Sequence, residues 1–302
     1  MKNFIAFRIN PTFVIAPVVL EQLLSKNAFV SIGATQEKTT GFVDPLYRDN
    51  EAVQGQERKF VRLCGDAMVF ALKIEKKSVP SSIIKQELKV RAAARELETG
   101  FAPGSKWKKD TKEEIIISNL PKCFPKSSEL QGYLDLKNKL LIVGSGSPKA
   151  AEDLASVLRK EIEGLEPRFF AVTSRPGFQL TEWVRTGEVP DGFSVDMDGE
   201  MKHDAGGKIR FVNQNMTTAE VQAHIKAGYG ITNLALTFDS EISFSATADF
   251  AFKKLTWLKI ADDMQAEDKE QEFAAQMALQ SADIARLVVA LAQSYGGEQV
   301  PE

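Results

Sequence analysis

The sequence contains few of the residues that build disulfide frameworks and most transition-metal sites. Only two cysteines and two histidines occur among 302 residues. Two cysteines make no disulfide framework, so we expect Cys64 and Cys123 to be free thiols in a reducing cytosol. His203 and His224 are 21 residues apart and the cysteines are 59 apart, which matches no paired-ligand motif. The sequence therefore predicts no metal site built from these residues and no bound cofactor.

Long hydrophobic runs and nucleotide-binding loops are also missing. No segment approaches the roughly 18 consecutive apolar residues of a membrane helix. Residues 1–8 carry no small-residue cleavage site, so we expect no export signal. The segment 144–147 (GSGS) superficially resembles a dinucleotide-binding loop, but its spacing fails, and a strand-to-helix turn is expected there. What remains, 43% apolar and 26% charged residues, is typical of a globular protein of about two domains.

The net charge of −3 argues by itself against a nucleic-acid partner, but the charges are segregated along the chain. Residues 73–126 carry a net charge of +6, and residues 261–302 carry −7. Because salt confines the field of each charge to about 8–10 Å, the local excess matters more to a polyanion than the total. The basic segment is therefore a candidate surface for phosphate groups. The competing interpretation is an ordinary solvated helix face.

The basic segment has the pattern of a helical hairpin. A first helix is predicted to begin at residues 80–82 and to end before the break at Gly100 and residues 103–104, and a second helix to run from about residue 105 to 119. In the first helix, apolar and basic side chains fall on opposite sides at 100° per residue. The apolar stripe comprises Ile83, Val90 and Leu97, and the basic side comprises Lys85, Lys89, Arg91 and Arg95. The second helix carries Lys106, Lys108, Lys109 and Lys112. We expect this hairpin to project from the body.

The rest of the chain predicts an α+β fold with mixed or antiparallel sheets, packed helices and a long C-terminal helix. Strands are predicted at residues 4–9, 28–32, 60–64, 68–74, 130–136, 139–143, 169–172, 193–197, 208–212, 233–238, 241–245 and 250–258. Helices are predicted at 17–24, at 148–163, after a capping box at 217–220, and from Phe273 to Leu291. Residues 39–55 are expected to be loop-rich.

Three regions follow from this order of elements. We place residues 1–75 and 127–175 in one central α+β body. Residues 76–126 form the basic helical finger inserted into it. Residues 176–302 form a second α+β region that includes the C-terminal helix.

One set of three acidic residues can be compared with nuclease sites, which need only a few Asp and Glu residues around two metal ions. Asp196, Asp198 and Glu200 alternate on one predicted strand and could share a face. No Glu-x-Lys companion follows an apolar strand at a suitable spacing. The alternative is a solvated strand edge before the Gly206-Gly207 turn. The sequence therefore shows no convincing set of catalytic residues.

Five sequence blocks, taken in order, resemble the RdgC family of bacterial recombination-associated proteins. The blocks are 80–85 (PSSIIK), 120–124 (LPKCF), 180–185 (LTEWVR), 224–228 (HIKAG) and 232–236 (TNLAL). No single block is diagnostic, but five in the right order span nearly the whole chain. The resemblance implies a cytoplasmic, nucleoid-associated protein that forms a ring-shaped homodimer around DNA. It further implies binding mainly to duplex DNA, more weakly to single strands, with little sequence preference, and antagonism of RecA-dependent recombination.

The resemblance also implies where the subunits meet. Lys122 and Phe124 match one dimer contact of the family, and Asn213 and Gln214 match the other. Two residues depart from the family pattern: Cys123 replaces a small alanine, and Asn213 stands where relatives have lysine. We therefore expect the second contact to be weaker or differently bonded.

The charge pattern and the resemblance together give a set of expected DNA contacts. A ring needs few base contacts, so phosphate neutralisation would suffice. The expected contacts are Lys76, Lys77, Lys85, Lys89, Arg91, Arg95, Lys106, Lys108 and Lys109. Only Trp107 and Phe101 are aromatic nearby, which disfavours a stacking platform for single strands. The alternatives are a metal-dependent exonuclease and a protein-binding scaffold whose basic finger is merely solvated.

Overall fold

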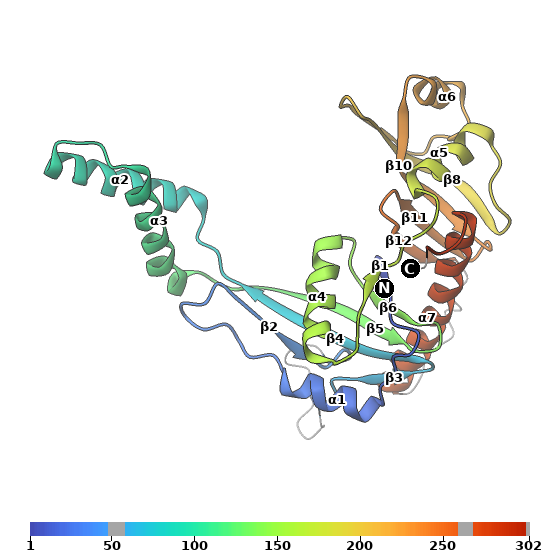
Figure 1. Ribbon diagram of the computed structural model, residues 1–302, viewed down its shortest axis with the longest axis horizontal. Helices are drawn as coiled ribbons and strands as arrows, with labels where there is room; N and C mark the ends of the chain where they lie inside the picture. The colour runs from blue at the N-terminus through green and yellow to red at the C-terminus, as the bar shows by residue number, and fades with distance from the viewer. Residues whose placement is uncertain (48–57, 259–267, 300–302) are drawn as a thin grey trace. The chain divides into compact units, whose positions relative to one another are not determined.

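The computed structural model describes residues 1–47, 58–258 and 268–299. Within them, seven helices and a twelve-stranded antiparallel sheet confirm the α+β class (Figure 1). The strands are β1 (Phe4–Arg8), β2 (Lys38–Val43), β3 (Arg62–Cys64), β4 (Ala67–Lys76), β5 (Lys126–Asp135), β6 (Leu140–Val143), β7 (Arg168–Phe169), β8 (Phe193–His203), β9 (Lys208–Phe211), β10 (Tyr229–Phe238), β11 (Ile242–Thr247) and β12 (Ala251–Trp257). The helices are α1 (Pro17–Lys26), α2 (Ser81–Thr99), α3 (Ser105–Asn119), α4 (Pro148–Glu161), α5 (Pro176–Thr186), α6 (Ala219–Lys226) and α7 (Lys269–Ser294), with a short 3-10 helix η1 (Leu120–Lys122).

The chain divides into two compact units. The larger unit comprises Met1–Leu24, Asp44–Phe70 and Leu130–Glu302, and the smaller unit comprises Ser25–Val43 and Ala71–Glu129. The boundary falls inside β4 and β5, which contribute residues to both units. The three-region division drawn from the sequence stays a prediction.

In the larger unit, β1 organises the sheet. Residues Ile5 to Arg8 pair with β6 along one edge, while β12 and β7 share the opposite edge. From β12 the sheet continues through β11, β10, β8 and β9. The predicted long C-terminal helix is confirmed as α7. Its residues Met277, Ile284, Leu287 and Leu291 are all buried in the core of this unit. Burying this apolar stripe is what stabilises so long a helix.

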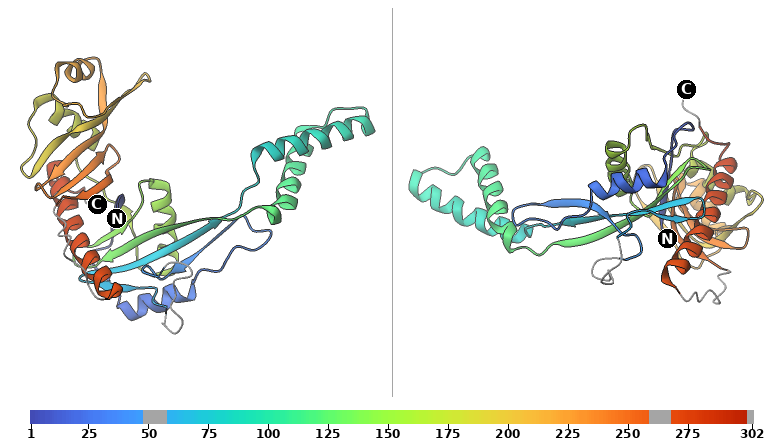
Figure 2. Two further views of the ribbon diagram at one scale, coloured as in Figure 1. Left: turned by 180° about the vertical axis from the view of Figure 1, so that it is seen from behind. Right: turned by 90° about the horizontal axis from the view of Figure 1, so that it is seen from below.

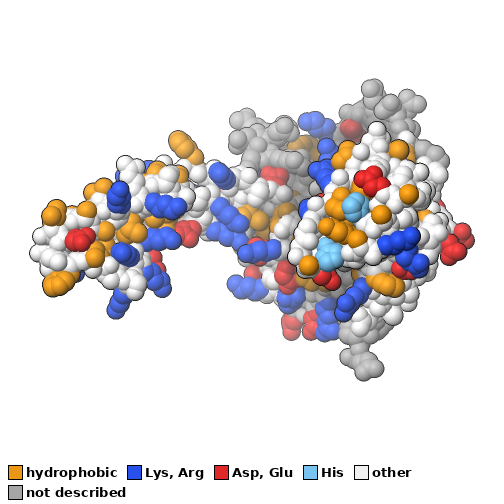
Figure 3. Space-filling model, turned by 90° about the horizontal axis from the view of Figure 1, so that it is seen from above, with side chains coloured by type: hydrophobic (Ala, Val, Ile, Leu, Met, Phe, Trp, Pro, Cys, Tyr) orange, Lys and Arg blue, Asp and Glu red, His pale blue; other side chains and the backbone are white. Residues whose placement is uncertain are grey.

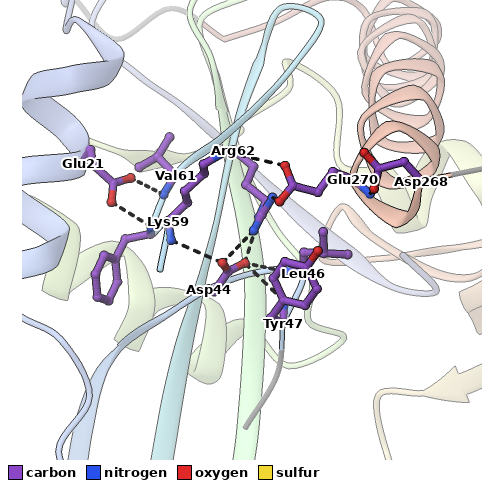
Figure 4. Close-up of polar contacts among 10 residues, drawn as sticks. Glu21, Asp44, Leu46, Tyr47, Lys59, Val61, Arg62, Asp268 and Glu270 are labelled. Atoms are coloured by element: carbon purple, nitrogen blue, oxygen red, sulfur yellow. Dashed lines mark hydrogen bonds and ion pairs between the residues drawn. The ribbon is translucent and has the colours of Figure 1, made fainter. Parts of the chain in front are cut away.

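A buried ion-pair cluster ties α7 to the strand layer of the larger unit (Figure 4). The Arg62 guanidinium donates to both carboxylate oxygens of Asp44, at 2.8 and 2.7 Å, and lies 3.3 Å from the Glu270 carboxylate on α7. Burial alone would raise the pKa of Asp44. Hydrogen bonds from Arg62 and from the backbone N–H groups of Leu46 and Tyr47 outweigh it, so the pKa lies below its ordinary value.

The smaller unit consists of two strands, the start of β5, and the two helices between them. β2 pairs with the last six residues of β4, from Lys38 opposite Lys76 to Val43 opposite Ala71. α2 follows β4, and α3 leads the chain back into β5 (Figure 1, Figure 2). The buried Glu75 accepts hydrogen bonds from the Ile32 backbone N–H at 3.0 Å and the Ser127 hydroxyl at 3.1 Å. These bonds hold three chain segments together at this end of the unit.

Two predictions in this part of the chain were wrong. Residues 28–32 form no strand: Ala28 makes one isolated parallel bridge to Phe42, and Ile32 bonds to a carboxylate instead of a strand. Conversely, residues 39–43 of the expected loop belong to β2; positions 48–55 of that loop lie outside the described residues. The backbone at Phe29 lies so close to β2 that position 41 requires glycine, since a Cβ atom there would lie 2.3 Å from the Phe29 Cα. Local propensity alone does not reveal such a contact.

Candidate nucleic-acid interface

The helical hairpin forms with the boundaries expected from the sequence. α2 ends at Gly100, whose left-handed φ of 76° suits glycine and whose N–H donates to the Glu96 carbonyl at 2.8 Å. α3 begins after Gly104 and ends at Asn119. The two helices pack antiparallel. Three contacts from the tip to the base record this: Arg95 over the Trp107 ring at 5.5 Å, Arg91 to Glu114 at 3.5 Å, and Glu87 to the Asn119 amide at 3.0 Å.

The apolar stripe of α2 does not face α3, contrary to the usual reading of an amphipathic helix. Ile83, Val90 and Leu97 are 40%, 65% and 89% exposed, and α2 contains no buried residue. The half-buried positions include Ile84 and Leu88 instead. The face packed on α3 therefore lies to the side of the stripe, where Arg91 and Arg95 also contact α3. The hairpin therefore presents apolar and basic side chains together on its surface (Figure 3).

The basic residues of the hairpin fall into two groups. Arg91 bridges Glu87 and Glu114, and Arg95 lies over Trp107, so both arginines contribute to the packing of α2 against α3. The lysines are exposed, and in the described part of the chain they form no ion pair. This second group comprises Lys85, Lys89, Lys106, Lys108, Lys109 and Lys112. Its ammonium groups are the ones open to an external anion.

Most of the basic excess lies at the base of the hairpin rather than on its helices. α2 and α3 together carry eight basic and six acidic residues, a net charge of +2. Residues 73–80 and 120–126, which flank them, carry five basic and one acidic residue, a net charge of +4. The predicted contacts Lys76 and Lys77 belong to this basal group. Lys38 and Lys126 lie beside them around one pocket.

Sequence reasoning missed Lys38 and Lys126. The two lysines are 88 positions apart in the chain, so no local cluster of basic residues contains both. Lys38 lies opposite Lys76 because of the register in which β2 pairs with β4. That register follows from the β2 strand that the sequence pattern did not predict.

The residues expected at subunit contacts lie in or near loops. Phe124 is 91% exposed, two residues after η1, and the ammonium of Lys122, the last residue of η1, lies 3.4 Å from the Asn119 side-chain oxygen. In the larger unit, Asn213 has a left-handed φ of 53°, and its N–H donates to Asp198 at 2.9 Å. The Gln214 amide donates to Glu220 at 3.0 Å. A role of these four residues in dimerisation stays a prediction.

The three carboxylates considered for a nuclease site do not converge. The alternation expected for β8 breaks at an irregularity, where Val195 pairs with Leu236 but Gly199 pairs with Leu234. Asp196 accepts hydrogen bonds from the Thr237 and Ser243 hydroxyls. Asp198 and Glu200 have different partners again: the Asn213 N–H and Lys254 for Asp198, and Thr232 and Lys208 for Glu200. Each carboxylate is thus engaged by its own structural neighbours.

Other candidate chemistry has an equally structural explanation. Residues 1–47, 58–258 and 268–299 contain no group of three or more His, Cys, Asp or Glu residues arranged to hold a metal ion. The segment 144–147 is the predicted strand-to-helix turn, with the Ser147 hydroxyl accepting from the Ala150 N–H at 3.4 Å. Burial raises the pKa of the Cys64 thiol to about 11, which keeps it protonated. In the described helices, no apolar stretch is long enough to cross a membrane.

The expected capping box before α6 is not formed. Thr218 is the N-cap residue, but its side chain makes no capping hydrogen bond, and its hydroxyl is buried without a partner. Thr217 bonds to Asn215 instead, through both its N–H and its hydroxyl at 2.8 Å. The loop that carries Asn213 and Gln214 is therefore held by the Thr217–Asn215 bonds and by the hydrogen bond from Gln214 to Glu220 of α6, without a capping box.

The chain matches known proteins over almost its full length. A family model described as "Putative exonuclease, RdgC" matches residues 1–298. A recombination-associated protein RdgC of Herminiimonas arsenicoxydans is 31% identical, covering 99% of this chain and 98% of the relative. Relatives of the same name from Proteus mirabilis and Tolumonas auensis are each 30% identical, covering 98% and 99% of this chain, respectively. Because both the model and the relatives span the whole chain, this protein belongs to the RdgC family of recombination-associated proteins.

Proposed function

We propose that this protein binds double-stranded DNA without sequence preference, encircles it as a ring-shaped homodimer, and thereby limits RecA-dependent recombination in the cytoplasm, at the nucleoid. Single-stranded DNA is bound more weakly. A ring that occupies duplex DNA denies it to a recombinase without reading its sequence. The relatives' shared name connects the family to recombination.

The six exposed lysines of the hairpin carry this proposal. Lysine is a compact charge suited to phosphate, and phosphate contacts supply sequence-independent affinity. Their ammonium groups form no ion pair in the described residues, whereas Arg91 of the same hairpin pairs with Glu87 and Glu114. Base reading normally relies on side chains such as Arg and Asn positioned against base edges, and no such constellation stands out on the hairpin.

Closure into a dimer is supported by the exposed aromatic at the end of the hairpin. Phe124 is 91% exposed. Aromatic side chains of this kind often anchor protein interfaces, where burial removes their apolar surface from water. A second copy of the chain is the partner that the family resemblance provides.

Salt-dependent binding to a duplex tests the DNA-binding part of the proposal. We expect log Kobs to fall linearly with log[salt], with several phosphate contacts costing orders of magnitude in affinity between about 50 and 200 mM. The variant K85Q/K89Q should reduce the slope by up to about 2, whereas K149Q/K160Q, with the same change in net charge, should leave it unchanged. Arg91 and Arg95 are left intact because they hold the hairpin together. A wild-type protein without salt-dependent affinity would favour the scaffold alternative.

The exonuclease alternative comes from the printed description of the family model. The geometry gives it little support, because Asp196, Asp198 and Glu200 are each engaged separately. Incubation with end-labelled duplex and Mg²⁺ or Mn²⁺ decides the matter. We expect no nucleotide release. Release that disappears in Asp196→Ala, but persists in the exposed control Glu163→Ala, would establish the nuclease and overturn the non-catalytic account.

A further inference from the structure

An open pocket lies where three strand ends of the smaller unit meet. β2 begins at Lys38, β4 ends at Lys76, and β5 begins at Lys126. The pocket has a volume of about 420 Å³. It is lined by Glu37, Lys38, Lys76, Lys77, Ser78, Lys126, Ser127 and Ser128. Four lysines and one glutamate thus line a single pocket.

The backbone forces two of these lysines together. Lys38 and Lys76 are directly opposed partners in the β2–β4 ladder, so their side chains leave the same face of the sheet. Like charges in this position repel each other and destabilise a strand pair. The Lys77 ammonium is held at the rim by the Gly33 carbonyl at 3.1 Å, which orients it without neutralising it.

One acid close to the pocket in the sequence is already engaged elsewhere. Glu75 precedes Lys76, but its carboxylate is buried, where it accepts from Ile32 and Ser127 and pairs with Lys73 at 3.6 Å. The hydrogen bond from the Ile32 backbone N–H is the main cause that lowers the pKa of Glu75. Among the lining residues, Glu37 alone is acidic. The pocket therefore keeps a positive excess.

We propose that this pocket binds a phosphate group of a nucleic-acid backbone. Ammonium groups and the hydroxyls of Ser78 and Ser128 supply the donors that a phosphate oxyanion requires. No aromatic side chain lines the pocket, so it offers no stacking surface for a base. The inference rests on the proposed DNA-binding function and adds to it a second site at the base of the hairpin, where Lys38 and Lys126 act with Lys76 and Lys77.

The test compares two variants of the full-length protein with the same change in net charge. K76Q/K126Q removes two ammonium groups of the pocket, and K149Q/K160Q removes two exposed lysines of the larger unit. Affinity for a short duplex is measured by fluorescence anisotropy across a salt series. We expect K76Q/K126Q to reduce the slope of log Kobs against log[salt] by about 1–2 and to weaken binding on the order of tenfold at moderate salt. The control should behave like the wild type, and both should show the wild-type thermal unfolding transition or one slightly higher.

Other results separate the possible failures. If the wild type binds DNA with a steep salt slope and K76Q/K126Q retains that slope, the pocket proposal is overturned while the proposed function stands. If the wild type shows no salt-dependent affinity for DNA, both are overturned. Pyrophosphate and ATP serve as free phosphate probes. Tight binding of either by the wild type and not by K76Q/K126Q, with an unchanged DNA slope, would assign the pocket to a soluble phosphate compound instead.

Discussion

Lys38 on β2 and Lys76 on β4 face each other directly across the strand pair at the base of the hairpin. Two like charges in register oppose the pairing that brings them together. Both line the same pocket, together with Lys77 and Lys126. An arrangement that lowers the stability of the free protein and suits a polyanion is typical of a binding surface, where stability is exchanged for affinity. The charge at the base of the hairpin should therefore affect both the stability of the protein and its affinity for DNA, and both can be measured.

Replacing Lys76 by glutamine should raise stability and lower affinity at once. Removing one member of a like-charge cross-strand pair should increase the free energy of unfolding by about 0.2–1 kcal/mol. Urea denaturation at low salt measures the gain, which should shrink as salt screens the repulsion. A destabilised variant would show that Lys76 serves the fold instead.

The buried pair between Asp44 and Arg62 should be the most sensitive ionic contact in the larger unit. Their side chains are 3% and 7% exposed. Asp44→Asn leaves the guanidinium with only the partial compensation of Glu270, so we expect a loss of about 3 kcal/mol in the free energy of unfolding. Glu114→Gln, which removes an exposed ion pair on the hairpin, is the matched control and should cost less than about 1 kcal/mol. Equal effects of the two changes would contradict this view of the cluster.

The same pair should make the protein sensitive to acid. Because the pKa of Asp44 is lower in the folded protein than in the unfolded chain, the stability it contributes is complete above the unfolded value. That contribution is lost as pH falls below about 4 and through the folded pKa. Denaturant midpoints measured between neutral pH and about 3 should therefore fall more steeply for the wild type than for Asp44→Asn. Parallel curves would assign the acid sensitivity to other carboxylates.

Phe124 should matter to assembly and not to the fold of the subunit. Truncating a side chain that is 91% exposed should leave unfolding within about 0.5 kcal/mol of the wild type. If Phe124 anchors a dimer contact, Phe124→Ala should weaken self-association by about 2 kcal/mol, or roughly 30-fold, in sedimentation equilibrium. Phe101→Ala removes a comparably exposed phenyl ring and should leave association unchanged. Equal behaviour of the two variants would exclude Phe124 from the contact.

The sequence predicts the hairpin well because its signals are local. Gly100 supplies the left-handed turn after α2, and Gly104 precedes the first residue of α3. The long helix α7 is equally clear, since its apolar residues repeat at three and four positions. Both predictions depend only on neighbours in the sequence, and periodicity captures such neighbours.

Features that depend on distant pairing escape the same reasoning. The apolar stripe through Val90 does not mark the packed face of α2, since the contacts with α3 are made from another face of the helix. The irregular pairing of β8 cancels the alternation assumed for Asp196 and Asp198. The lysine pocket exists only because β2, β4 and β5 place Lys38, Lys76 and Lys126 together. The spacing of these lysines in the sequence does not predict that they lie together.

Retention on closed circular DNA tests the central claim most directly. The protein is bound to a covalently closed circular duplex and washed with salt concentrated enough to remove ordinary phosphate contacts. The circle is then cut once, and the wash is repeated. The account predicts that the wild type stays on the closed circle and leaves after the cut, and that Phe124→Ala is lost in the first wash. Equal loss of the wild type from circular and linear DNA would contradict a ring that encircles the duplex.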